Sequence, residues 1–183
     1  MSTYPYTIDN GAGEKMTFLG IMRDDSGAER IDVEMRAQPG SGPPMHVHHR
    51  QEEVMTVQSG TVGYQVLGEE SRTAGEGETL AFAAGIAHRW WNAGTTEAYF
   101  TGWSKPAYNM EYFLTALFQG MREHGGNPDM FDMAFLTRRY RSEFRTYAVP
   151  GLVQTLIFPV LVVLGRALGK YDKFKDAPKP VKA

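Results

Sequence analysis

The hydrophobic pattern of this chain changes its period near Pro106, and this change constrains the fold more than any other feature. From Lys15 to about Trp103, apolar residues alternate with polar ones in short runs separated by glycine-containing turns, which is the pattern of β-strands. After Pro106, apolar residues recur every three or four positions, as in amphipathic helices. The pattern predicts a β domain over residues 1–105 and a helical extension over residues 106–183.

The β region holds about eight short runs of this kind, among them 31–36, 53–58, 61–67 and 88–92. No helical pattern interrupts them. Short strands joined by tight turns, without intervening helices, are typical of a β-sandwich or a closed barrel. We therefore expect a mainly β fold with an appended α-helical part.

Three helices are expected in the extension. The first covers 109–123 and carries an apolar stripe at helical spacing. The second begins at Asn127-Pro128, which offers an N-cap and a first-turn proline, and runs to about Phe144. The third covers about 152–168. The charged, proline-containing tail that starts at Lys170 is expected to fray.

The segment 146–165 contains no charged residue and permits two interpretations. A helix of that length would span about 30 Å, the thickness of a bilayer core, so membrane association through 146–165 is one of them. Pro150, Pro159 and Gln154 argue against a continuous span. The favoured interpretation is an apolar helix that packs on the barrel or on the second subunit of a homodimer.

Composition excludes several classes of function. Nineteen basic and 21 acidic residues give a net charge of −2, and no helix-turn-helix pattern is present, so nucleic acid is not an expected partner. The absence of cysteine excludes disulfides, thiolate metal sites and cysteine nucleophiles. The first fifteen residues have neither a basic nor an apolar segment of the kind found in secretion signals, so we expect a cytoplasmic location.

The chain carries a candidate metal-binding set. His46 and His48 lie two positions apart, so on a strand their imidazoles project from one face. Glu53 begins the next extended run, and His88 lies in a second glycine-bounded block. Three neutral imidazoles and one carboxylate suit one divalent transition metal per chain, with Fe, Mn, Ni, Zn and Cu as the candidates.

These two blocks resemble the paired motifs of the cupin superfamily. The first motif, G-x5-H-x-H-x4-E-x6-G, is matched in full, and the second, G-x5-P-x-G-x2-H-x3-N, is matched except at its proline, where Ala83 stands. The matching positions are Gly40, His46, His48, Glu53 and Gly60, followed by Gly77, Gly85, His88 and Asn92. The resemblance covers about residues 15–105. It implies an antiparallel jelly-roll barrel in which His46, His48, Glu53 and His88 are the metal ligands.

Strand alternation also predicts which residues surround the metal. Trp90 shares the face of His88 and Met55 shares that of Glu53, and Met35, Tyr64 and Phe82 are expected beside them. Such walls suit a small apolar or aromatic ligand. The alternative is that the same residues simply fill the core of the barrel.

The favoured function is that of a metal-binding cupin acting on a small organic molecule as a dioxygenase-like oxidoreductase. The alternatives are a metal-dependent isomerase or lyase, and a non-catalytic cupin that binds a small molecule. No residue is assigned as a catalytic acid or base.

Overall fold

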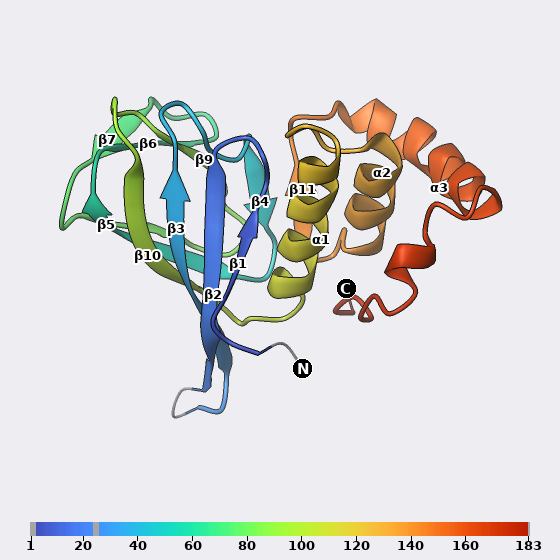
Figure 1. Ribbon diagram of the computed structural model, residues 1–183, viewed down its shortest axis with the longest axis horizontal. Coiled ribbons are helices and arrows are strands. Elements are labelled where there is room, and N and C mark those ends of the chain that lie inside the picture. Colours follow the sequence, from blue (N-terminus) through green and yellow to red (C-terminus); the bar gives the residue numbers. More distant parts are fainter. Residues whose placement is uncertain (1–2, 24–25, 183) are drawn as a thin grey trace.

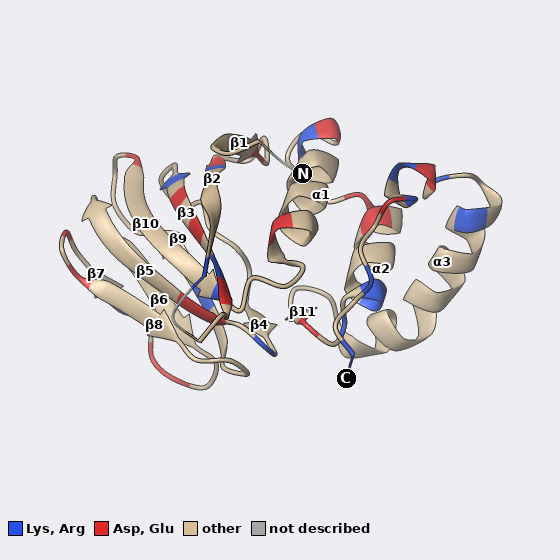
Figure 2. Cartoon of the chain, turned by 90° about the horizontal axis from the view of Figure 1, so that it is seen from below, with Lys and Arg blue, Asp and Glu red and all other residues tan. Residues whose placement is uncertain are grey.

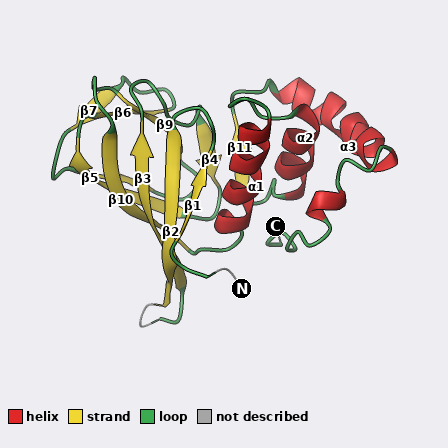
Figure 3. Ribbon diagram, viewed as in Figure 1, coloured by secondary structure: helices red, strands yellow, loops and turns green. Residues whose placement is uncertain are grey.

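The computed structural model describes residues 3–23 and 26–182. A two-sheet β domain lies on one side, and the helices lie beside it (Figures 1 and 3). The strands of the described residues are β1 (Tyr6–Asp9), β2 (Glu14–Arg23), β3 (Glu29–Ala37), β4 (His46–His48), β5 (Glu52–Ser59), β6 (Val62–Val66), β7 (Arg72–Ala74), β8 (Thr79–Phe82), β9 (Ala87–Asn92), β10 (Ala98–Lys105) and β11 (Phe144–Thr146).

The strands form two antiparallel sheets. Within the described residues, one sheet has the order β1-β2-β3-β10-β5-β8 and the other has the order β11-β4-β9-β6-β7. Non-consecutive strands therefore lie side by side, as expected for a jelly-roll barrel. The predicted mainly β fold with C-terminal helices is confirmed.

The space between the sheets is filled by the apolar side of the alternating strands. On β3, Ile31, Val33 and Met35 are buried, whereas the residues between them are more accessible. Trp90 of β9 packs against the edge of Phe100 of β10, with ring centroids 4.8 Å apart. The period-2 pattern thus places one residue set inside the barrel and the other at its surface.

The helices of the described residues are α1 (Met110–Glu123), α2 (Met130–Arg139), the π-helical turn η1 (Val153–Ile157), α3 (Phe158–Ala167) and the 3-10 turn η2 (Asp172–Phe174). The first helix agrees with its prediction. The second differs at both ends: its N-cap is Asp129, whose side chain accepts hydrogen bonds from the backbone N–H groups of Phe131 and Asp132, and it ends at Arg139 instead of near Phe144.

The early end of α2 allows the chain to return to the barrel. Phe144 starts β11, which pairs with β4 and places Phe144 opposite His48. A phenylalanine four positions after Tyr140 fits a helical stripe as well as a strand, so the local pattern could not distinguish the two; pairing with a distant strand decides it. The extension therefore contributes a strand to the barrel sheet.

The third helical segment runs without a gap over residues 151–167, close to the predicted 152–168, but it contains a π-helical turn. Pro159 has no N–H to donate within a helix, and the five residues of η1 directly before α3 adopt π-helical geometry. Phe158 and Gly165 are buried, but much of the outer face is exposed. No helix in the described part of the chain is both long and apolar enough to cross a bilayer. The membrane interpretation of 146–165 therefore gains no support.

The C-terminal tail is anchored, in contrast to the expected fraying. The side chain of Arg139 donates to the carbonyl oxygens of Ala177 and Pro178, and the hydroxyl of Ser142 donates to the carbonyl of Val181. Tyr171 and Phe174 are buried against Phe135. Aromatic contacts and hydrogen bonds to α2 and its C-terminal turn thus hold the tail on the helices.

Candidate metal centre and adjoining cavity

The four predicted ligands come together at one end of the barrel. His46 and His48 lie on β4, and His46 is paired in register with His88 on the neighbouring strand β9. Glu53 lies on β5 in the facing sheet, opposite Phe82 and Ser104. One candidate ligand atom from each of these four residues lies within 4.8 Å of all the others. The two sheets thus bring the two sequence motifs to a single point.

Backbone carbonyls orient two of the imidazoles. Nδ1 of His46 lies 2.8 Å from the carbonyl oxygen of Pro44, and Nδ1 of His88 lies 2.9 Å from that of Ile86. A ring nitrogen beside a carbonyl oxygen must carry the hydrogen, so Nδ1 donates and Nε2 faces the cluster. This carbonyl contact is the usual way in which proteins fix a metal-binding imidazole.

Aromatic rings hold two of the ligands from outside the cluster. Phe82 stacks on His88 with ring centroids 3.9 Å apart and planes inclined by 4°. The ring of Phe144 meets His48 edge-on at 5.5 Å, and Phe113 of α1 stacks on Phe144 at 4.5 Å. The helical extension therefore supports His48 directly, through a residue that the sequence pattern assigned to a helix.

The contacts of Glu53 require a positive charge. Its Oε2 lies 3.1 Å from Nε2 of His88 and 3.6 Å from Nε2 of His48. A neutral imidazole that donates through Nδ1 presents a lone pair at Nε2, and this lone pair would repel the carboxylate. A proton on the ring or a bound cation removes the repulsion.

The ring of His48 also has an unsatisfied nitrogen, because its Nδ1 is buried without a hydrogen-bond partner. This donor set suits a divalent cation.

Burial and mutual charge adjust the protonation of the cluster. Burial lowers the pKa of His46, and it lowers the pKa of His48 to about 3. Burial alone would raise the pKa of Glu53, but the hydrogen bond with His88 and the electrostatic attraction of the histidine rings outweigh it and lower that pKa to about 2. Neutral His46 and His48 beside an ionised carboxylate are in the protonation states that metal coordination needs.

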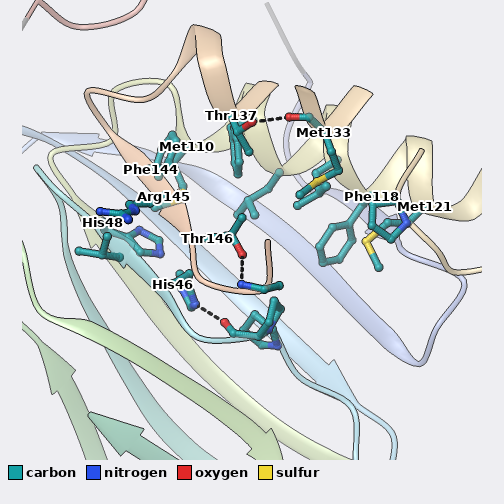
Figure 4. A pocket seen from close by; sticks show the side chains of 18 of the residues that line it. His46, His48, Met110, Phe118, Met121, Met133, Thr137, Phe144, Arg145 and Thr146 are labelled. Carbon is teal, nitrogen blue, oxygen red and sulfur yellow. Dashed lines mark hydrogen bonds between the residues drawn. The ribbon is translucent and has the colours of Figure 1, made fainter. Parts of the chain in front are cut away.

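A cavity of about 550 Å³ opens from the candidate metal centre into the space between the barrel and the helices. His46, His48 and Glu53 are in its wall, and the remaining wall is mostly apolar (Figure 4). The barrel contributes the inner faces of β2 and β3, and the extension contributes α1, α2 and the segment from β11 to α3. Its volume is within the range of sites that enclose small organic molecules.

The predicted substrate-binding residues divide into two groups. Met35 and Trp90 line the cavity. Met55, Tyr64 and Phe82 do not: Met55 is buried in the barrel core, and Phe82 lies between Tyr64 and His88. Alternation identifies the residues that point into a barrel, but it does not distinguish packed interior from hollow interior.

The sequence analysis did not identify the helices as a wall of the cavity, although the apolar stripe of α1 is visible in the sequence. The stripe on α1 that predicted an amphipathic helix supplies Met110, Phe113, Leu114, Leu117, Phe118 and Met121, and all of them line the cavity. An apolar helical stripe is usually read as a packing face. Glu14 on β2 also lines the cavity and carried no motif that would have identified it.

Residues 33–103 match the family model described as Cupin domain. The chain contains a cupin domain. Its jelly-roll sheets and the convergence of the two histidine-containing motifs agree with this assignment.

Two fungal proteins resemble the cupin chain in sequence. The oxidoreductase iacF of Pestalotiopsis fici is 30% identical over 116 residues, which are 60% of this chain and 55% of that protein. The probable oxidoreductase virH of Hypocrea virens is 29% identical over 68 residues, which are 36% of this chain and 31% of that protein. The matches thus span about half and about a third of these relatives.

Among solved structures, KdgF from Halomonas sp. resembles the cupin barrel with a TM-score of 0.50 at 15% sequence identity. The match covers 58% of this chain and 92% of that chain. At this identity the likeness concerns the fold alone.

Proposed function

We propose that this cupin is a mononuclear metal-dependent oxidoreductase that acts, in the manner of a dioxygenase, on a small organic molecule bound in the cavity. The observation that carries the proposal is the opening of the three-histidine, one-glutamate cluster into an apolar cavity. A metal there would face the bound molecule instead of being enclosed as a structural ion. The two fungal relatives, named as an oxidoreductase and a probable oxidoreductase, support the same class of reaction.

The residues present define what each would contribute. His46, His48 and His88 would bind the ion through imidazole nitrogens, and Glu53 would supply one negative charge. A redox-active divalent ion held there would supply the electron exchange with dioxygen and substrate. The apolar wall excludes water from the reacting end of the substrate, and the carbonyls of Pro44 and Ile86 keep two imidazoles aimed at the ion.

The test is metal-dependent oxygen consumption. Metal-free protein is loaded separately with Fe²⁺, Mn²⁺, Ni²⁺ or Cu²⁺, and oxygen uptake is recorded with panels of flavonols, catechols and thiols. We expect uptake that requires one metal and one substrate class and is absent from the His46→Ala/His48→Ala double variant. Loaded protein that consumes no oxygen but isomerises or cleaves a carbonyl substrate would instead favour the lyase or isomerase alternative.

A further inference from the structure

The cavity runs along the axis of α1, which lines it over most of the helix. The lining residues of this helix run from Met110 to Met121, a distance of about 16 Å at the helical rise. The hydroxyl of Tyr6 on β1 donates to Glu111 near the start of α1, whereas Gly11, just after β1, approaches Arg122 near its end. The helix therefore runs along β1, over the same sheet whose inner face forms the opposite wall.

The candidate metal centre lies at one end of this axis. Ile31, a lining residue of β3, is paired with Ser104, which is in turn paired with Glu53. In Figure 4, Met110 lies on the His48 side of the cavity, whereas Phe118 and Met121 lie away from the histidines. The start of α1 thus faces the metal end and its last turn faces the other end.

A buried carboxyl group, that of Glu14, marks the distal end. Glu14 opens β2 opposite Ala37, six residues along β3 from Ile31, which is about 20 Å of strand. Its side chain lines the cavity and accepts a hydrogen bond of 2.9 Å from Asn10. Burial raises the pKa of Glu14 to about 7, so this group can present either a hydroxyl donor or a carboxylate acceptor near neutral pH.

We infer that the ligand is an elongated, largely apolar molecule that lies along α1, with its reacting end at the metal centre and a hydrogen-bonding group near Glu14. The identity of the reacting end rests on the proposed function. The elongated shape and the distal carboxyl rest on the cavity alone. In this arrangement the helical extension sets the length of ligand that the cupin accepts, and the barrel supplies the chemistry.

The first experiment measures how affinity depends on chain length. Straight-chain carboxylic acids of six to sixteen carbons compete with 1-anilinonaphthalene-8-sulfonate for the Zn²⁺-loaded protein, since Zn²⁺ has no redox chemistry. Each added methylene should tighten binding about fourfold until the chain reaches the distal end, after which affinity should stop rising. We call the acid length at which affinity stops rising the break length, or the break, and we compare it between variants.

Three variants of α1 test the position of the ligand. Met121→Trp should move the break to shorter acids, and Met121→Ala should move it to longer ones, because this side chain lines the distal end. Gln119→Trp adds the same bulk on the exposed face of the helix and should leave the series unchanged. A series without length dependence, or a break that both Met121 variants leave in place, would overturn the inference.

A second series tests the distal carboxyl. Near the break length, acids with a terminal hydroxyl should bind wild-type protein more tightly, relative to unsubstituted acids, than they bind Glu14→Leu protein. An equal preference in the two proteins would remove Glu14 from the inference. Oxygen uptake separates this result from the proposed function. If affinity depends on acid length but the protein never consumes oxygen, the proposed reaction is refuted and the ligand class is not. If the protein consumes oxygen but affinity does not depend on acid length, the ligand class is refuted and the reaction is not.

Discussion

At the residue scale, Glu53 supplies the negative charge of the candidate metal centre. We expect Glu53→Gln to weaken metal binding at least roughly tenfold, because a neutral amide stabilises a divalent ion less than a carboxylate does. Titration calorimetry of the metal-free protein measures this change. Glu52→Gln is the matched control, because this substitution removes the same charge one position earlier, at an exposed site. Equal affinities for the two variants would contradict the role of Glu53.

The raised pKa of Glu14 predicts that the stability of the protein falls as pH rises. Burial raises its pKa from 4.5 to about 7, so between these values the folded chain holds a proton that the unfolded chain releases. The free energy of unfolding should therefore fall as pH rises from about 4.5 to 7. Glu14→Gln should be more stable than wild type at pH 8, and this gain should vanish below pH 4.5.

Thermal unfolding followed by circular dichroism across this pH range measures the difference between the two proteins. The exposed Glu76→Gln change is the control, and its melting temperature should differ from that of wild type by the same small amount at every pH. A Glu14→Gln protein that parallels Glu76→Gln would show that Glu14 is not desolvated in the folded state.

The candidate ligand cluster could be anticipated in part from sequence, because the spacing within each motif is local. His46 and His48 must share a strand face, and this requires no knowledge of the fold. The contact between His48 and Phe144 could not be anticipated, since it depends on β11 returning to β4. Met55 and Phe82 show the same limit: their inward direction follows from alternation, but their position outside the cavity depends on packing.

At the scale of elements, a buried carboxylate joins the start of α1, the turn after α2 and the tail. Glu143 is fully buried and accepts hydrogen bonds from the side chain and backbone of Asn109 and from the backbone N–H of Val181. Glu143→Ala should lower the free energy of unfolding by roughly 3 kcal/mol, since it leaves these donors without an acceptor. Urea denaturation measures the loss.

The exposed Glu70→Ala change serves as the control, and it should alter stability by no more than about 0.5 kcal/mol. A Glu143→Ala protein as stable as this control would mean that the hydrogen bonds of Glu143 contribute nothing measurable to stability.

Element types were more predictable than their ends and their partners. The stripe on α1 and the alternation on β3 each persist over several periods, and both elements form as predicted. The end of α2 and the anchored tail depend on hydrogen bonds between residues far apart in the chain, such as that between Tyr140 and Pro178. No local pattern records such a partner.

At the scale of the whole molecule, the outer face of α3 remains apolar and exposed. Val160 and Val163 of α3 keep 62% and 67% of their surface accessible, Leu152 just before η1 keeps 76%, and Figure 2 shows few charges along α3. An exposed apolar face of this kind is typical of an interface. The homodimer expected from the sequence stays a prediction, and we expect the two subunits to contact each other through this face.

We expect Val160→Glu/Val163→Glu protein to be monomeric and wild-type protein to be dimeric when both are measured by light scattering after size exclusion. Leu67→Glu places one such charge on an exposed apolar site of the barrel and should leave the dimer intact. A wild-type protein that is monomeric at micromolar concentration, or a dimer that survives the double change, would refute this contact.

The pairing of β11 with β4 has a consequence for the order of events during synthesis. Strand β4 carries His46 and His48, and its outer neighbour β11 leaves the ribosome only after both α1 and α2 have been made. Until then β4 is an uncovered sheet edge, open to pairing with another nascent chain. This edge is closed only after translation has passed Thr146, so a chain that stops earlier should aggregate.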